Sequence, residues 1–226
     1  MRDRTAALVR FYATLAELEG KLGGKRTLGE CHGRMTWPRQ GVYFFFEPGE
    51  TRLPGPGLRV VRVGTHALVE GQCSTLWSRL RQHRGSASSD GGNHRGSVFR
   101  KLVGSALINR RDMVCESWSK GKNTAKELRL LECESERCVS QTMSRFQLLW
   151  LPVGESRMRG YIERNSIALL SSYRADLGMD SASSKWLGRS SGFEKCVKSG
   201  LWNSNHVDEL WDSDFPKKFT ELVDAL

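Results

Sequence analysis

The sequence predicts a mixed α/β domain in which a few short strands lie among amphipathic helices. Two β-prone segments, at residues 42–46 and 58–63, flank a turn rich in proline and glycine and form an antiparallel hairpin. An apolar run at residues 146–152 predicts a third strand, which its closing proline ends. A chain of 226 residues can bury one core, and we expect one small domain that carries large insertions.

The helices are predicted from capping residues and from apolar positions at helical spacing. The first carries Leu8, Phe11 and Leu15 and stops at Gly23-Gly24. Ser74 or Thr75 can cap a second helix that runs to His83. Further helices are expected from about Ser97, from a capping box at Thr124–Glu127, from Tyr161 with Glu163 in its first turn, and from Phe215 to Leu226.

The charge balance predicts an anionic partner. The chain has 35 Lys and Arg against 25 Asp and Glu, a formal net charge of +10 and a pI of about 9.6, which favours nucleic acid. No apolar run approaches a membrane-spanning length, so we expect no membrane partner. The six cysteines form no CxxC pair and are expected to be reduced thiols of a cytoplasmic protein. The segment 121–124 lacks the spacing of a phosphate loop, so no nucleotide cofactor is expected.

An ordered set of short motifs indicates a family. Gly41-Val42-Tyr43 stands in the first strand of the hairpin, and Val63-Gly64 ends the second. A basic helix and later polar residues follow in the same order, namely Arg79, His83, His94, Glu163 and an asparagine at Asn203 or Asn205. The arrangement resembles the GIY-YIG nuclease family. One position departs from the pattern, because Arg62 stands where the family has a second tyrosine.

The resemblance implies a fold and an activity. It implies a small sheet of three antiparallel strands flanked by helices, with N-terminal and internal helical additions. It also implies phosphodiester hydrolysis in DNA with one divalent cation. The expected domains are an N-terminal helical extension at 1–30, the nuclease domain at 41–207 with a helical insertion at 113–141, and a tail at 208–226.

The roles that the resemblance implies agree with the chemistry of the residues. The Arg79 guanidinium matches phosphate oxygens and can neutralise developing charge. Glu163 can hold Mg²⁺ or Mn²⁺, which prefer oxygen ligands. Tyr43, with help from His83, is expected to position or deprotonate the attacking water. His94 is expected to contact the phosphate or orient Arg79, and Asn203, with Asn205 as its rival, to fix Glu163 or the phosphate.

Each of these residues also has an ordinary structural explanation, so the prediction depends on the whole set. Tyr43 suits a core strand, Arg79 a solvated helix and Glu163 a helix start. A surface that follows the nucleic-acid backbone is expected from basic residues around and after the basic helix. These are Arg62, Arg81, Arg84, Arg95, Arg100, Lys101, Lys122 and Lys126.

The sequence therefore predicts a metal-dependent DNA endonuclease, with a restriction or defence role favoured over a repair role. Double-strand cleavage favours two protomers acting together on duplex DNA, or one monomer that nicks each strand in turn. Two alternatives stay open. One is a non-catalytic nucleic-acid-binding accessory protein, for which Arg62 is the main argument. The other is a nuclease that acts on RNA or branched DNA.

Overall fold

The fold was analysed in a computed structural model that describes residues 4–52, 55–69, 71–86, 88–89, 91–121, 125–174 and 180–226. Four strands form one sheet: β1 (Arg26–Thr27), β2 (Gly41–Thr51), β3 (Leu58–Gly64) and β4 (Gln147–Pro152). The helices are α1 (Arg4–Leu22), α2 (Leu76–Arg84), α3 (Val98–Arg110), α4 (Lys126–Met143), α5 (Ser156–Leu170), α6 (Glu194–Ser199) and α7 (Phe215–Asp224), with 3₁₀ helices η1 (His94–Gly96) and η2 (Leu187–Ser190).

The sheet is antiparallel and has the order β1-β4-β2-β3. The predicted α/β class and the three predicted strands are confirmed, but the sheet has four strands where three were expected. The additional strand is β1, which pairs with β4 over two residues. Sequence patterns do not reveal a strand of this length, because two residues show no periodicity.

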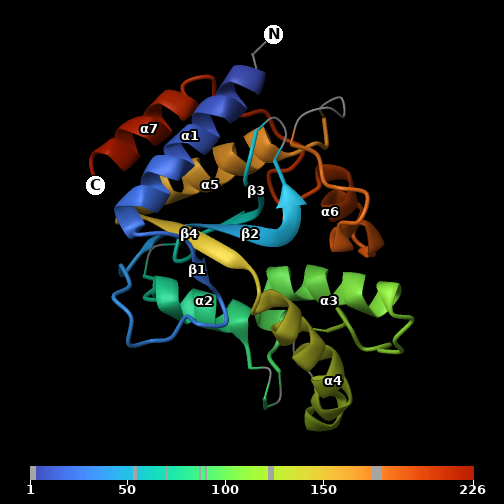
Figure 1. The fold of residues 1–226 in the computed structure, drawn as a ribbon. Helices are drawn as coiled ribbons and strands as arrows, with labels where there is room; N and C mark the ends of the chain where they lie inside the picture. Colours follow the sequence, from blue (N-terminus) through green and yellow to red (C-terminus); the bar gives the residue numbers. More distant parts are fainter. Residues whose placement is uncertain are drawn as a thin grey trace.

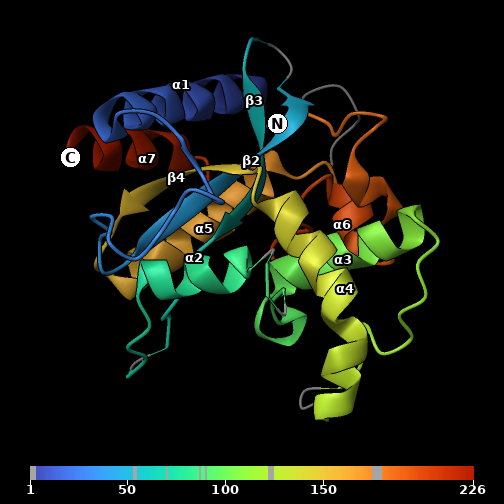
Figure 2. The ribbon, with the colours of Figure 1, turned by 60° about the horizontal axis from the view of Figure 1, so that its bottom comes forward.

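Helices cover both faces of the sheet, as Figures 1 and 2 show. One face packs on α1, α5 and α7, and the other on α2, α3, α4 and α6. Side chains on β2 alternate between the two cores: Val42 and Phe44 enter the first core, while Tyr43 and Phe45 enter the second. The uninterrupted apolar run of this strand is therefore explained by burial on both faces.

The terminal helices belong to the core of the domain. Phe11 of α1 stacks on Phe219 of α7, with ring centroids 5.2 Å apart, and meets Phe44 of the sheet edge-on at 6.1 Å. Both helices contribute fully buried side chains to the same apolar cluster as β2. The α1 and α7 helices, which lie in the segments that the sequence suggested were additions, thus cover one face of the central sheet.

One predicted helix start differs from the structure, and the cap proposed for another lies outside the described residues. The α5 helix begins at Ser156 rather than at Tyr161, so Glu163 lies in its middle and not in its first turn. Residues 122–124, which include the proposed Thr124 cap and Lys122, lie outside the described residues, and α4 begins at Lys126. The predicted cap of α2 is Thr75, whose hydroxyl accepts from Ser78 N while the Ser78 hydroxyl accepts from Thr75 N.

Among the described residues, no helix has both the length and the apolar character needed to cross a membrane. The six cysteines are free, and two of them, Cys31 and Cys196, are buried. Burial raises the pKa of the Cys31 thiol to about 11, so this thiol is protonated at neutral pH and behaves as an apolar side chain.

A buried carboxyl group on β2 leads to a prediction about stability. Glu47 accepts hydrogen bonds from the indole N–H groups of Trp186 (2.9 Å) and Trp202 (2.8 Å). Burial raises the pKa of Glu47 to about 7. The folded chain therefore binds this proton more tightly than the unfolded chain does. The resulting stabilisation is fully present below the ordinary carboxyl pKa and is lost as the pH rises through about 7.

We expect Glu47→Gln to remove this pH dependence. The stability advantage of the wild type over the variant should fall by up to roughly 3 kcal/mol between about pH 4 and pH 8. Urea unfolding of both proteins at several pH values measures the difference. Parallel stability curves for the two proteins would show that Glu47 titrates normally.

Candidate active site

A chain of buried hydrogen bonds joins the first motif to the basic helix. The Tyr43 hydroxyl on β2 lies 2.7 Å from His83 Nε2 on α2, and His83 Nδ1 lies 2.8 Å from the Ser97 hydroxyl that caps α3. Tyr43 and His83 are both 0% exposed. Burial, together with the charges of Arg79 and other nearby arginines, lowers the pKa of His83 well below its ordinary value. The imidazole is therefore neutral at physiological pH.

The glycine of the second motif makes room for this tyrosine. Tyr43 and Gly64 are direct partners in the β2–β3 ladder. A Cβ on Gly64 would overlap the Tyr43 hydroxyl and its ring. The tyrosine of one strand and the glycine of the other are thus required together, which gives the paired motifs a steric basis.

Arg79 and Glu163 approach the end of β3 from opposite faces of the sheet. Arg79 on α2 is held by Gly96 O and by Gln82 Oε1, each 2.9 Å from its Nη1. Glu163 on α5 accepts the N–H of Thr65, the residue after β3, at 3.2 Å. Burial raises the pKa of Glu163, and the charges of Arg62, His206 and Arg79 oppose that rise. The Arg79 guanidinium and the Glu163 carboxylate therefore interact electrostatically.

A cavity of about 330 Å³ opens beside Arg79, between the loop after β3 and α2. Thr65, His66, Ser74 and Gln82 also line it. Thr65 is fixed there because its hydroxyl donates to Gly41 O at 2.8 Å, which ties the second motif to the first. Tyr43 and His83 do not line this cavity.

Arg62, at the position of the second tyrosine, is buried and faces the same core as Tyr43. Its Nη1 donates to Trp202 O, and its guanidinium lies 5.5 Å from the centroid of the Phe99 ring. Its charge acts on both Glu163 and His83. Since Arg62 is only 7% exposed, the structure does not present it to DNA as a backbone contact.

The two candidate asparagines have different surroundings. Asn203 is buried, and its amide accepts from Val63 N (3.2 Å) and donates to Val63 O (2.9 Å). The neighbouring Trp202 N also donates to Val61 O at 2.7 Å. Asn203 therefore fixes the C-terminal segment along β3, whereas Asn205 is exposed.

His94 and two of the nominated arginines belong to a second network, which meets the first where Arg100 Nη1 donates to His83 O at 2.9 Å. His94 stacks on Trp118 with ring centroids 3.9 Å apart, and its Nδ1 lies 3.0 Å from Glu136 Oε1. Arg100 is completely buried and pairs with Glu136. Arg95 makes a bidentate pair with Glu132 at 2.6 and 2.7 Å. The His94 side chain does not orient Arg79; the Gly96 carbonyl of the same 3₁₀ helix does.

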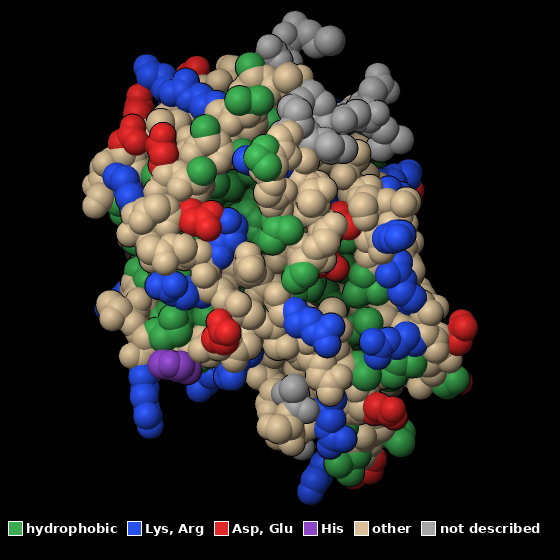
Figure 3. Space-filling view, in the orientation of Figure 1, with side chains coloured by type: hydrophobic (Ala, Val, Ile, Leu, Met, Phe, Trp, Pro, Cys, Tyr) green, Lys and Arg blue, Asp and Glu red, His purple; other side chains and the backbone are tan. Residues whose placement is uncertain are grey.

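The remaining nominated basic residues have different accessibilities. Arg81 and Lys126 are exposed, and Lys101 is partly buried beside the Phe193 ring. Arg84 donates to Gly29 O at 3.1 Å. Figure 3 shows Lys and Arg side chains gathered over α3 and α4, interrupted by a few acidic groups. These exposed side chains suit a phosphate-binding surface better than the buried Arg62 and Arg100.

The donor groups at the site suit a cation held by a single carboxylate. Among the described residues, no three His, Cys, Asp or Glu side chains form a cluster that could hold a metal ion. Mg²⁺ binds through one or two carboxylates and fills its other positions with water and substrate phosphate. The second oxygen of Glu163 makes no hydrogen bond with a described residue, so it can serve as such a ligand.

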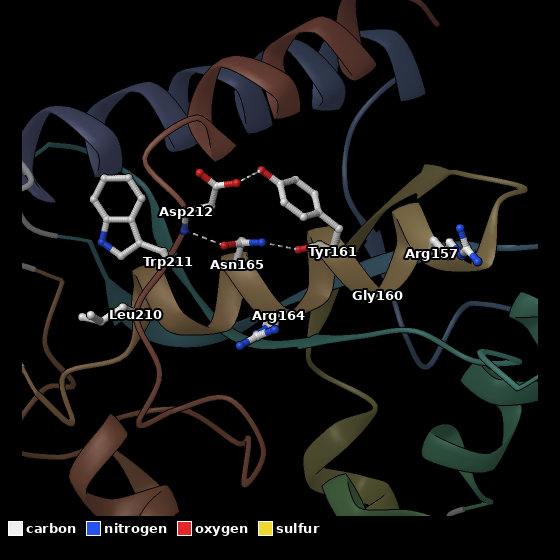
Figure 4. Close-up of a pocket in the computed structure, with 8 residues that line it drawn as sticks. All are labelled: Arg157, Gly160, Tyr161, Arg164, Asn165, Leu210, Trp211 and Asp212. Atoms are coloured by element: carbon white, nitrogen blue, oxygen red, sulfur yellow. Dashed lines mark hydrogen bonds between the residues drawn. The ribbon is translucent and has the colours of Figure 1, made fainter.

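Another pocket, of about 550 Å³, lies between α5 and residues 210–212 (Figure 4). Its polar groups bind one another: the Tyr161 hydroxyl donates to Asp212, and the Asn165 side chain bridges Tyr161 O and Asp212 N. None of the nominated catalytic residues lines this pocket. We therefore locate the candidate active site at Arg79 and Glu163.

The sequence interpretation missed three residues at the site. Thr65 supplies the N–H that holds Glu163, His66 lines the cavity, and His206 acts on the charge of Glu163. His66 follows the second motif by two positions, and His206 stands in the segment that contains both candidate asparagines. Their proximity to recognised motifs was the available signal.

The contacts of Asn203 predict a structural effect. Asn203→Ala should lower the free energy of unfolding by roughly 2 kcal/mol or more, because Val63 loses the partners of both its N–H and its C=O. Asn205→Ala, at an exposed position, is the control and should change stability by less than about 0.5 kcal/mol. Urea denaturation measures both variants, and equal losses would contradict this assignment.

Comparison with known proteins agrees with the motifs. The family described as GIY-YIG domain matches residues 2–226. No curated protein and no solved structure gives a significant match. The match spans α1 and α7 as well as the sheet, in agreement with their shared core. The chain therefore belongs to the GIY-YIG family and is a nuclease of that superfamily.

Proposed function

We propose that the protein is a divalent-metal-dependent DNA endonuclease that acts in the cytoplasm in restriction or defence. The observation that carries the proposal is that Arg79 lines the cavity at the end of β3, where Thr65 in the same lining donates its N–H to Glu163, and that the charge of Arg79 acts on this carboxylate. One group is a cation suited to phosphate, and the other is a carboxylate suited to a hard metal ion. They come from helices that pack on opposite faces of the sheet, which supports a site at the end of β3.

The chemical demand is the neutralisation of charge. Attack of water on a phosphodiester builds negative charge on the phosphoryl oxygens and on the leaving oxygen. Arg79 is held by two hydrogen bonds from one nitrogen, so its other N–H groups can contact a phosphate oxygen without prior rearrangement. A cation held by Glu163 would supply further charge neutralisation at the phosphate and the leaving oxygen.

Tyr43 and His83 enter the proposal as a proton-accepting pair behind these groups. A neutral imidazole bonded to the phenol can share its proton. The pair has no exposed surface, so direct contact between Tyr43 and water requires the covering residues to move. Ser97 keeps His83 in place from the other side.

Contacts with the DNA backbone are proposed for the exposed basic residues, and base contacts for residues 113–141. The α4 helix extends away from the sheet and carries exposed Lys126 together with exposed leucines (Figure 2). Such a projecting element can reach beyond the cleavage site. Two protomers on symmetric duplex DNA would provide one active site for each strand.

We expect Arg79→Ala and Glu163→Gln each to reduce Mg²⁺- or Mn²⁺-dependent plasmid cleavage by roughly 10²-fold or more, because each removes charge stabilisation at the reacting phosphate. DNA affinity should stay within a few-fold of the wild type. Single-turnover cleavage assays and fluorescence anisotropy separate the two effects. The controls are Arg10→Ala and Glu221→Gln on α1 and α7, which should cleave normally.

Full cleavage by either site variant would contradict the assignment of that residue. A wild-type protein that binds DNA but cuts no strand at any Mn²⁺ concentration would favour the accessory binding protein. Parallel incubation with supercoiled plasmid, branched DNA and RNA tests the proposed substrate. Preferential cutting of RNA or branched DNA would replace duplex DNA in the proposal.

Removal of exposed positive charge should weaken binding without affecting chemistry. Arg81→Ala and Lys126→Ala are each expected to reduce by about 1 the slope of log affinity against log salt concentration, because one phosphate contact is lost. Lys217→Ala on α7 is the matched control. Unchanged salt slopes in both variants would move the DNA-binding surface elsewhere.

A further inference from the structure

His66 lies at the same site, and its ring nitrogen Nε2 can accept a hydrogen bond. It is the second residue after β3 and lines the cavity beside Arg79. Its side chain is more than nine-tenths buried, with 7% of its surface exposed. Its Nε2 is buried and has no hydrogen-bond partner among the described residues. Buried polar atoms are normally satisfied, so an unpaired atom beside a cavity indicates a partner that enters the cavity.

The hydrogen bond on the other ring nitrogen fixes the tautomer. His66 Nδ1 lies 3.0 Å from Ser74 O, and the Ser74 hydroxyl is farther away at 3.5 Å. A carbonyl oxygen only accepts, so Nδ1 carries the proton and donates it. Nε2 is then the unprotonated nitrogen of a neutral ring, with its lone pair available to a donor.

The surrounding charges keep this ring neutral. Burial lowers the pKa of His66, and the cationic groups of Arg159 on α5 and Arg79 on α2 lower it further, while the bond to Ser74 O opposes them. These are the charged groups that act on the ring from the helices on either side. At neutral pH the lone pair of Nε2 is therefore free of a proton.

The loop that carries His66 is held in a fixed shape. Ala67 adopts a φ of 51°, in the left-handed region that residues with a Cβ seldom occupy. Arg159 Nη2 donates to Ala67 O at 2.8 Å, and its Nη1 bonds Gln40 Oε1 at 2.9 Å. The Arg159 guanidinium thus holds the turn in its strained form and fixes the position of His66.

We propose that His66 Nε2 is the general base that accepts a proton from the attacking water in phosphodiester hydrolysis. This inference rests on the proposed function and changes one step of it, because His66 takes the proton of the attacking water in place of the buried Tyr43–His83 pair. His66 and Arg79 line the same cavity, so a water bonded to Nε2 would lie near a phosphate held by Arg79. Tyr43, which is fully buried, cannot contact that water without a movement of its surroundings.

The proposed step transfers one proton to His66 and exchanges one P–O bond for another. An O–H bond of the water breaks and its proton passes to Nε2, while the water oxygen forms a bond to phosphorus. The P–O bond to the leaving nucleotide oxygen breaks with its electron pair, and that oxygen takes a proton from solvent water. The His66 imidazolium then returns its proton to solvent, which restores the neutral ring.

The test compares His66→Asn with wild type and with His32→Asn, a matched change at an exposed histidine. Asparagine can keep the bond to Ser74 O but cannot accept a proton at the Nε2 position. We expect the single-turnover cleavage rate of His66→Asn to fall by about 10²–10⁴-fold with unchanged DNA affinity. The acid limb of the pH–rate profile should disappear in His66→Asn and persist in His32→Asn.

A measurement on the wild type does not depend on the folding of the variant. Histidine ¹⁵N NMR should show an Nδ1-protonated ring for His66, and its titration midpoint should match the acid limb of kcat/KM. Wild-type cleavage together with a normal rate and profile in His66→Asn, or with a mismatched midpoint, would overturn the role of His66 and leave the nuclease proposal standing. Absence of cleavage by the wild type on every nucleic acid would overturn both.

Discussion

The site depends on the buried hydrogen bond between Tyr43 and His83. This bond joins strand β2 to α2. Because Arg79 precedes His83 by one turn of the same helix, the bond also sets where the Arg79 guanidinium lies. Loss of either partner would leave a buried polar group unsatisfied at a cost of about 1–3 kcal/mol. The bond requires glycine at position 64, because a Cβ there would overlap the Tyr43 hydroxyl. The hydrogen bond between His83 and Ser97 connects the pair to α3.

The second half of the site comes from the opposite layer. Glu163 on α5 lies at the end of β3, where its carboxylate accepts a hydrogen bond from the Thr65 N–H. This bond favours the charged form of Glu163. Arg62 and Arg79 add positive charge around a carboxylate whose burial alone would favour protonation. The charges of Arg62 and Arg79 therefore oppose the protonation that burial favours at Glu163.

Local signals allowed the sequence to predict the hairpin, the Thr75 cap and the order of the motif residues. Contacts between residues far apart in the chain could not be predicted. Spacing does not reveal that Arg100 is neutralised by Glu136, since 36 positions separate them. Asn203 looked catalytic by its position, yet its amide is used along β3. The start of α5 was missed because Glu155, its N-cap, makes no side-chain capping bond.

The net positive charge of the chain acts through its exposed residues. Three arginines are each paired with a glutamate in buried or nearly buried surroundings, namely Arg59, Arg95 and Arg100. These pairs carry no net charge, so they add nothing to the electrostatic field outside the protein. The surplus must then come from groups that water, salt and an anionic partner can reach. Attraction of a polyanion to such groups is screened by salt, whereas the internal pairs are not. Salt would thus weaken capture of nucleic acid while leaving the geometry around Arg79 and Glu163 intact.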